Sequence, residues 1–350
     1  MQKHSSLLFW LCMSFFCAQL RGAAVAGEAS RFEFTQAEMG LPFRIVLYAP
    51  DKPTAEAAAN AAFARIHQLN NILSDYDPDS ELSQLSQTSG QGKAVPVSQD
   101  LWIVLQRAQE MAKRSQGAFD ITVGPYVSLW RKARREKKMP DPIKLAEARR
   151  AVGYTNLRLD RHRRTAELLV PHMRLDLGGI AKGYAIDEAL AVLRAHGIKQ
   201  ALVTGAGDMA MGDPPPGKKG WRIEIAPLDA PDAPPTTFVV LARSALATSG
   251  DLFQRLDING KRYSHIVDPH TGLGLTDHSL VTVIARDCIT ADCLSTAVSV
   301  LGPHKGLKLV EKTPGAAARI VRRPNEQIEI AESRGFKKYY EGQSLRRAMR

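Results

Sequence analysis

Residues 174–187, with the sequence R-L-D-L-G-G-I-A-K-G-Y-A-I-D, constrain the fold of this chain more than any other stretch. A short apolar run carrying Asp176 meets a pair of glycines, and an Ala- and Leu-rich segment begins near Lys182. Apolar residues then recur with the spacing of a helix face, at Ile186, Leu190 and Leu193. The pattern predicts a strand, a glycine turn and a helix.

The glycine pair has two interpretations. Glycine permits backbone conformations that a Cβ forbids, and it allows a ligand to approach bare backbone. The first amides of the following helix have no partner within the helix, and Lys182 adds a positive charge, so the segment is suited to phosphate. It has neither a G-x-G-x-x-G pattern nor the Ser or Thr that follows the lysine of a P-loop. A tight strand-to-helix turn without a ligand is the alternative.

The first 26 residues have the pattern of a secretory signal peptide. A basic start precedes an almost wholly apolar run at 7–17, and Ala24-Val25-Ala26 offers small residues for cleavage. The run is too short for a lasting membrane span, and a retained anchor is the alternative. We therefore expect an exported protein, either periplasmic or anchored to the outer face of the inner membrane.

The chain is basic. Its formal net charge is +11, and removal of residues 1–26, which contain Lys3, Arg21 and no acid, lowers it to +9. Such a charge suits anionic ligands, acidic membrane surfaces and nucleic acid alike. The dense basic run at 131–138 is typical of a solvated helix face, and no aromatic-rich surface for single strands accompanies it. We therefore predict no nucleic-acid partner.

Cys288 and Cys293 are the two cysteines that follow the predicted cleavage site. Two cysteines make neither a disulfide framework nor a zinc site. We interpret them as small core residues, and a disulfide between them is the alternative in an exported protein.

Helical and strand patterns are mixed along the chain. Helical spacing and capping signals predict helices over residues 54–73, 98–115, 142–153 and 293–301. Strand patterns occur in a hairpin at 32–49 and at 157–159, 166–170, 201–212, 221–226, 237–241, 244–248, 262–272 and 280–285. We expect an α+β fold of mixed, largely antiparallel sheets packed with helices, in one domain over 27–340 with a basic tail at 341–350.

Asp292 and Thr296 stand four residues apart in the last predicted helix, so their side chains share a face. Two oxygen donors so placed suit Mg²⁺, and the chain has no dense set of His or Cys that would favour zinc. The alternative is an aspartate that stabilises the start of its own helix and a threonine that bonds to the backbone.

Seven short motifs follow one another in a characteristic order. They are M-G at 39, D-P-D-S-E-L-S at 77, F-D-x-T-V-G-P at 119, D-L-G-G-I-A-K-G-Y at 176, T-G-A-G-D at 204, H-I-V-D-P-x-T-G at 265 and A-D-C-L-S-T-A at 291. In this order the chain resembles the ApbE-type FAD:protein FMN transferases over residues 39–302, which is nearly the whole mature chain.

The resemblance implies a Mg²⁺-dependent transferase that splits the diphosphate of FAD, joins FMN by a phosphoester to a Thr or Ser of an acceptor flavoprotein, and releases AMP. The implied acceptor is an exported or membrane-bound subunit of a redox complex. One alternative is a hydrolase that converts FAD to FMN and AMP. Another is a periplasmic protein that binds FAD without turnover, and a metal site at Asp292 and Thr296 favours an enzyme over such a carrier.

The resemblance also assigns site residues. Mg²⁺ would be held by the side chains of Asp292 and Thr296 and by the carbonyls of Gly179 and Ser295. FAD would contact Met39, Tyr76, Ala118, Phe119, Asp120, Asp176, Lys182 and Ile266. His265 and Asp292 would be catalytic, with His265 near the transferred phosphoryl group, where it could accept the proton of the attacking hydroxyl.

Overall fold

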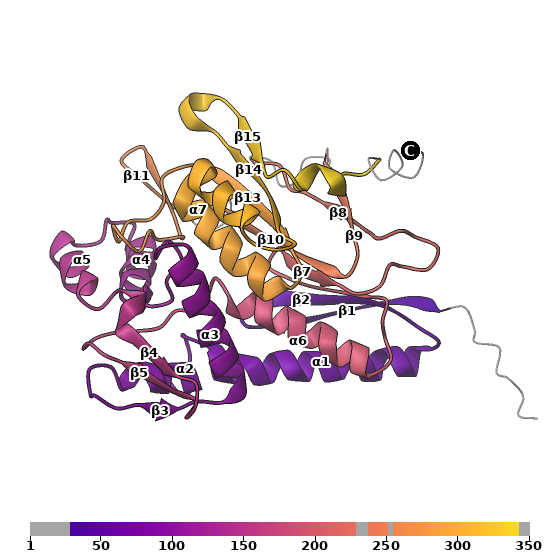
Figure 1. The fold of residues 1–350 in the computed structure, drawn as a ribbon, viewed down its shortest axis with the longest axis horizontal. Coiled ribbons are helices and arrows are strands. Elements are labelled where there is room, and N and C mark those ends of the chain that lie inside the picture. Colours follow the sequence, from indigo (N-terminus) through magenta and orange to yellow (C-terminus); the bar gives the residue numbers. More distant parts are fainter. Residues whose placement is uncertain (1–28, 229–236, 251–254, 343–350) are drawn as a thin grey trace, which may run out of the picture.

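The computed structural model describes residues 29–228, 237–250 and 255–342 (Figure 1). The predicted signal peptide at 1–26 lies outside these residues, as does the predicted tail at 341–350 apart from its first two residues. Within the described ranges, no helix has both the length and the apolar composition needed to cross a membrane.

An antiparallel sheet of eight strands lies at the centre of the described chain, in the order β1-β2-β6-β7-β10-β13-β14-β15. Its strands are β1 (Ser30–Glu38), β2 (Leu41–Ala49), β6 (Ala201–Gly205), β7 (Asp208–Met211), β10 (Ser244–Gly250), β13 (Ser279–Ala285), β14 (Ala317–Arg322) and β15 (Glu329–Glu332). The first two strands form the predicted hairpin, with Met39 and Gly40 at its turn. The chain leaves the sheet after β2 and returns at β6, so the segment between them is free to build helices.

Three long helices, α1 (Lys52–Leu73), α6 (Ala181–Ala195) and α7 (Cys288–Glu311), lie along one face of this sheet (Figure 1). Strand β2 shows why they do so. Its side chains alternate between the two faces, and Ile45 and Leu47 are fully buried in the core that contains the three helices. Val46 points the other way, into a second core. Both faces of β2 are therefore apolar and covered from Ile45 onward, whereas Arg44 is exposed.

The opposite face is covered by a two-stranded sheet of β8 (Trp221–Glu224) and β9 (Phe238–Leu241) and by the 3₁₀ helix η3 (Phe336–Tyr339). Trp221, Val239 and Phe336 from these elements are buried together with Val46 of the central sheet. The second core explains why the inner strands carry nearly continuous apolar runs rather than an alternating pattern.

A further layer extends from the helical side. It comprises α2 (Glu81–Gln87), α3 (Gln99–Arg114), α4 (Gly124–Glu136), α5 (Pro142–Arg149), a sheet of β3 (Val95–Pro96), β5 (Thr165–Leu168) and β4 (Leu157–Asp160), the hairpin of β11 (Arg255–Ile258) and β12 (Lys261–Ser264), and the 3₁₀ helix η1 (Tyr154–Asn156). The 3₁₀ helix η2 (Pro324–Glu326) instead connects β14 to β15 in the central sheet. Leu101 and Leu105 of α3 belong to the same core as α1 and α7, so this layer is continuous with the sheet-covering helices.

The predicted α+β class with largely antiparallel sheets is confirmed. The capping signal of α3 is also confirmed, because the Ser98 hydroxyl accepts a hydrogen bond from the amide of Leu101 at 3.2 Å. The boundaries of two predicted helices were wrong: α5 ends at Arg149 rather than at 153, and α7 begins at Cys288 rather than at 293 and continues across a kink at Gly302 to Glu311 rather than ending at 301.

The predicted strand before the glycine pair does not form. Arg174 makes a single bridge to Val123, and the amide of Asp176 donates to the carbonyl of Ile121 at 2.8 Å. Leu175 is fully buried. The apolar run that predicted a strand is thus a core-crossing segment with one backbone neighbour, because the loop at 118–123 pairs with it for too short a distance to make a sheet.

Candidate active site

Helices α6 and α7 meet in close contact at the glycine-rich segment. A Cβ at Gly183 would lie 2.7 Å from the carbonyl carbon of Cys288 and 2.9 Å from the Cβ of Asp292. A Cβ at Gly179 would lie 2.9 Å from the hydroxyl oxygen of Thr296. Neither glycine of the 178–179 pair has a positive φ. The predicted need for an unusual turn conformation was wrong, because these glycines allow two segments to touch.

Asp292 lies in the second turn of α7 and not at its start. The helix is capped by Asp287, whose side chain accepts from the amide of Thr290 at 3.0 Å. The Asp292 side chain is almost fully buried and accepts a hydrogen bond from the amide of Gly183 at 3.1 Å. The interpretation of Asp292 as a helix-start residue is therefore wrong, and its carboxylate instead joins α7 to the first turn of α6.

Two more oxygen atoms at this junction have no hydrogen-bond partner among the residues that the structure describes. These atoms are the Thr296 hydroxyl oxygen and the Gly179 carbonyl oxygen. The Gly183 amide, which stands four residues after Gly179, donates to Asp292 instead of to the Gly179 carbonyl. The alternative interpretation required Thr296 to bond to the backbone, and no such bond is present among the described residues. Ser295 differs, because its hydroxyl donates to the Asp292 carbonyl at 2.8 Å and its carbonyl accepts from the Ser299 hydroxyl at 2.9 Å.

Lys182 lies between two buried carboxylates. Its ammonium is 3.7 Å from an oxygen of Asp292 and 3.7 Å from an oxygen of Asp208, and it donates to the carbonyl of Gly178 at 2.6 Å. Asp208 begins β7, and its other oxygen accepts from the amide of Thr248 at 3.2 Å. Asp208 is not among the predicted site residues, and its place in the T-G-A-G-D motif is the only sequence signal that points to it.

Burial dominates the protonation of this group. It raises the pKa of Asp208 to about 8, with the charge of Asp292 adding to the effect and Lys182 opposing it. Burial also raises the pKa of Asp292, again against Lys182. For Lys182 burial acts to lower the pKa, but Asp292 and Asp208 outweigh it and leave the pKa above its ordinary value. The cluster therefore favours the addition of positive charge.

The predicted phosphate cradle at the start of α6 was wrong in one respect. The Gly183 amide already binds the Asp292 carboxylate, and the Ala181 amide donates to the carbonyl of Leu177 at 2.8 Å. An anion that reaches this helix start meets Lys182 rather than a row of unpaired amides.

A second charged cluster adjoins the first. Asp176 accepts from the amide of Gly178 at 2.9 Å and from the guanidinium of Arg131 at 3.0 Å, and Arg131 also pairs with Asp75. The Arg131 side chain is only 19% exposed. The prediction that the basic run at 131–138 forms a solvated face is wrong for its first residue. The guanidinium of Arg131 also lies over the exposed ring of Tyr76.

The predicted FAD-contacting run Ala118, Phe119 and Asp120 is buried beside the glycine pair. A Cβ at Gly179 would lie 3.3 Å from the ring of Phe119. The Asp120 carboxylate accepts from the amide and hydroxyl of Thr122 at 2.8 and 2.7 Å. These three residues pack beneath the glycine turn, with Phe119 against Gly179, and little of their side-chain surface is accessible to solvent.

Met39 reaches the same end of the sheet as Asp208. It occupies the β1–β2 turn with a φ of 51° and is half-buried. Near that turn Phe43 of β2 pairs with Gly205 of β6, and Gly205 pairs with Asp208 across the next turn. The register of three strands therefore brings two turns together that are about 170 residues apart in sequence.

His265 and Ile266 follow β12 rather than lying inside a strand as predicted. The Ile266 amide donates to the hydroxyl of Ser264 at 3.1 Å, and the side chain of His265 is half-buried. The hairpin packs on α4, where Val267 joins Tyr126 and Trp130 in a small core. His265 is thus carried by an arm that rests on the helix containing Arg131.

Among the described residues, no three His, Cys, Asp or Glu side chains form a group that could hold a metal by themselves. A metal at the α6–α7 junction would therefore need carbonyl and hydroxyl oxygens as well. The cysteines near this junction are not donors, since Cys288 and Cys293 are buried, unbridged thiols whose pKa burial raises. Their interpretation as small core residues is confirmed.

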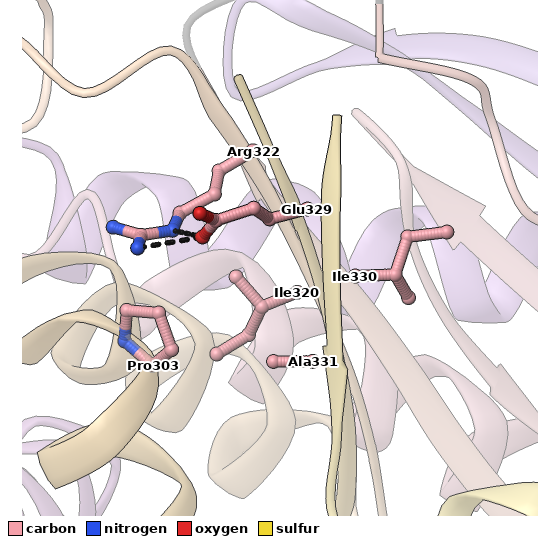
Figure 2. Close-up of a pocket in the computed structure, with 6 residues that line it drawn as sticks. All are labelled: Pro303, Ile320, Arg322, Glu329, Ile330 and Ala331. Atoms are coloured by element: carbon pink, nitrogen blue, oxygen red, sulfur yellow. Dashed lines mark hydrogen bonds and ion pairs between the residues drawn. The ribbon is translucent and has the colours of Figure 1, made fainter. Parts of the chain in front are cut away.

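A separate hollow lies at the far end of α7. It is lined by the helix residue Pro303 and by strands β14 and β15, and Figure 2 shows the ion pair between Arg322 and Glu329 at its rim, with nitrogen and oxygen 2.7 Å apart. It contains none of the predicted site residues. The chemistry-bearing side chains gather instead around the first half of α7.

The fold and site define an α+β protein in which four buried or nearly buried carboxylates and two cations form adjoining clusters at the α6–α7 junction. The Gly179 carbonyl and the Thr296 hydroxyl at this junction have no hydrogen-bond partner among the described residues. Known proteins share this architecture. The ApbE family matches residues 39–320. The chain is 34% identical to the FAD:protein FMN transferase of Haemophilus influenzae over 82% of this chain and 85% of that protein. It is 30% identical to the FAD:protein FMN transferase of Treponema pallidum over 91% and 92% of the two chains.

Solved structures agree. The flavin transferase ApbE from Vibrio cholerae superposes with a TM-score of 0.80 and 27% identity, covering 89% of this chain and 99% of that one. The apo flavinyl transferase ApbE from Pseudomonas stutzeri gives a TM-score of 0.79 at 30% identity, with 89% and 98% coverage. This chain belongs to the ApbE family.

Proposed function

We propose that this protein is an FAD:protein FMN transferase. The hydroxyl oxygen of an acceptor Thr or Ser attacks the phosphorus on the FMN side of the FAD diphosphate. The bond from that phosphorus to the bridging oxygen breaks, AMP leaves with the bridging oxygen, and the hydroxyl proton passes to a base. The observation that carries the proposal is the meeting of Lys182, Gly179, Asp292 and Thr296 where α6 crosses α7.

Asp292, Thr296 and Gly179 are the proposed ligands of Mg²⁺. Carboxylate, hydroxyl and carbonyl oxygens are the donors that Mg²⁺ prefers, and the last two have no competing hydrogen bond among the described residues. The Ser295 carbonyl is a weaker candidate because it already accepts from Ser299. Bound Mg²⁺ would neutralise charge that develops on the diphosphate oxygens.

The charge balance supports a divalent cation. Two cations, Arg131 and Lys182, lie among four carboxylates, those of Asp75, Asp176, Asp208 and Asp292. Burial raises the pKa of Asp208 to about 8 and also raises the pKa of Asp292, so the ionised forms of these two carboxyls are disfavoured where only Lys182 lies between them. A divalent cation bound beside them would stabilise the ionised carboxylates.

Lys182 is the proposed contact to the diphosphate. Its ammonium is held in position by Asp208 and Asp292 before any substrate arrives. Donors that are already oriented toward developing charge stabilise a transition state without reorganisation, which is the largest contribution expected in phosphoryl transfer.

His265 is the proposed acceptor of the hydroxyl proton, on the strength of its place in the H-I-V-D-P motif and its half-buried position after β12. Tyr76, which is exposed, and Met39, at the same end of the sheet as Asp208, are proposed to contact the flavin.

The acceptor is proposed to be an exported or membrane-bound flavoprotein with a Thr or Ser in a short recognition motif. This proposal rests on the signal-peptide pattern at 1–26. An enzyme that is exported would meet its acceptor in the periplasm or at the outer face of the inner membrane.

Mass spectrometry of a candidate acceptor tests the function. The purified protein is incubated with FAD, Mg²⁺ and the acceptor, AMP is measured in parallel, and a chelator is added to a matched sample. An acceptor heavier by one FMN less one water, with equal AMP and no product under chelation, would establish transfer. AMP without the adduct would favour the hydrolase, and bound FAD with neither product would favour the carrier. An acceptor in which the modified Thr is replaced by Ala is the control.

A further inference from the structure

Tyr76 presents a bare aromatic face beside the candidate site. Its side chain is 76% exposed, although the neighbouring Asp75 is buried. The covered face of its ring lies on the guanidinium of Arg131, whose central carbon is 4.1 Å from the ring centroid. An aromatic ring that is supported on one face and open on the other is suited to stacking with a flat ligand ring.

The backbone of this turn is held independently of the ring. The Ser74 hydroxyl accepts from the amides of Tyr76 and Asp77, each at 3.2 Å. The guanidinium of Arg174 donates to the carbonyl of Asp75. These contacts fix the path of the chain but leave the Tyr76 side chain free to rotate, so the stacking on Arg131 is what orients the ring.

Arg131 is itself held rigidly. One terminal nitrogen pairs with Asp75, and the other lies 3.0 Å from the Asp176 carboxylate. A planar guanidinium can bind two carboxylates at its edge while its face covers an aromatic ring, whereas a lysine ammonium offers no such face. The second oxygen of Asp176 accepts from the amide of Gly178. The same carboxylate therefore ties Arg131 to the turn that carries Gly179 and Lys182.

We propose that Arg131 is a positioning residue that holds Tyr76 as a stacking face for the isoalloxazine ring of FAD. The identity of the ligand rests on the proposed function. The role falls to the first residue of the basic run at 131–138, whose remaining members have no comparable pair of buried carboxylates.

Binding of FAD without an acceptor tests this role directly. In Arg131→Lys a positive charge remains between the two carboxylates but the planar face is lost. We expect the Kd for FAD, measured from flavin fluorescence, to rise about tenfold, and the KM for FAD to rise while kcat stays near that of the wild type. Arg135→Lys, the same change on an exposed position of α4, is the matched control and leaves the Kd unchanged.

A double-mutant cycle distinguishes two roles of Arg131, orientation of the Tyr76 ring and neutralisation of Asp75 and Asp176. In a Tyr76→Ala background, Arg131→Lys should change the Kd by less than about twofold, because the ring it orients is gone. An equal loss of affinity in both backgrounds would overturn the proposal, since Arg131 would then act only by neutralising Asp75 and Asp176. Wild-type affinity in Arg131→Lys would overturn it as well.

A second variant covers the case in which Arg131→Lys does not fold. Arg131→Gln combined with Asp75→Asn removes one cation together with one carboxylate, and it should weaken FAD binding to a similar degree. Wild-type protein that binds FAD with this dependence on Arg131 and Tyr76, but transfers no FMN, would contradict the proposed function and leave the role of Arg131 intact.

Discussion

At the scale of single residues, Asp292 joins two tasks. Its carboxylate accepts from the Gly183 amide and so holds α6 against α7, while its position beside Lys182 and Thr296 makes it the proposed charged ligand of Mg²⁺. Almost complete burial strengthens both interactions, because charges act over a low dielectric there. Substitutions of Asp292 and Gly183 should therefore have different effects, the first on turnover and the second on the stability of the fold.

Asp292→Asn should reduce turnover while the protein stays folded. An amide oxygen can still accept from Gly183, but the negative charge at the metal position is lost. We expect release of AMP from FAD to fall by more than about a hundredfold. The melting temperature serves as the check on folding, and Asp287→Asn, at the cap of the same helix, is the control. Turnover near the wild-type level would remove Asp292 from the site.

Gly183→Ala should destabilise the fold. Its Cβ would lie 2.7 Å from the carbonyl carbon of Cys288, which is backbone and cannot move aside cheaply. We expect the free energy of unfolding in urea to fall by about 3 kcal/mol. At Gly335 the nearest atom to an added Cβ is the Cβ of Ala317 at 3.8 Å, so Gly335→Ala should change stability by less than about 0.5 kcal/mol. Equal effects at the two positions would contradict the close-contact argument.

At the scale of elements, α6 and α7 are joined by hydrogen bonds in both directions. Asp187 of α6 accepts from the amides of Cys288 and Ile289 at 2.8 and 2.9 Å, and Asp292 of α7 accepts from the amide of Gly183. Each helix thus supplies a carboxylate to the first amides of the other, which otherwise lack partners. This exchange sets the register that places Thr296 beside Gly179.

The Asp187 carboxyl should make stability depend on pH. Burial raises its pKa from 3.8 to about 7, although the two amides act against this. Between these values the folded state holds a proton that the unfolded state has released, so stability from this group is full below pH 3.8 and is lost as the pH rises to about 7. We expect the fall in melting temperature from pH 5 to pH 7.5 to be smaller in Asp187→Asn than in the wild type.

The control for this measurement is Glu188→Gln, which removes the neighbouring carboxylate on the side of α6 that pairs with Arg65. It should keep the wild-type fall in melting temperature over the same range. An identical fall in Asp187→Asn and the wild type would show that Asp187 does not carry the proton.

At the scale of the whole molecule, the site is assembled from segments that are distant in sequence. Sheet register brings the β1–β2 and β6–β7 turns together, α6 and α7 cross beside them, and α4 adds Arg131 from the outer layer (Figure 1). Cation binding at such a site should stabilise the entire fold, because the ligands exist together only in the folded chain.

Removal of Mg²⁺ should therefore lower the melting temperature as well as abolish turnover. A cation present at a hundred times its Kd adds about 2.7 kcal/mol to the free energy of unfolding. We expect Mg²⁺ added to chelator-treated protein to raise the melting temperature, and to raise it less in Asp292→Asn. A wild-type melting temperature that is insensitive to Mg²⁺ would contradict the proposed metal site.

Local signals in the sequence predicted much of the fold. The hairpin at 32–49, the helical spacing of residues 54–73 and the cap at Ser98 each depend on neighbours a few residues away, and the structure confirms all three. The order of seven motifs was enough to indicate the ApbE family, because that order is a property of the sequence itself.

Only the tertiary structure decided which residues of these motifs contact one another. Asp208 belongs to the site because β7 places its carboxylate beside Lys182. Arg131 differs from the rest of its basic run because it pairs with two carboxylates from other segments, Asp75 and Asp176. The glycines of the central stretch were needed for contact with α7 rather than for a turn. Burial and long-range proximity set these roles, and neither can be read from residues that are neighbours only along the chain.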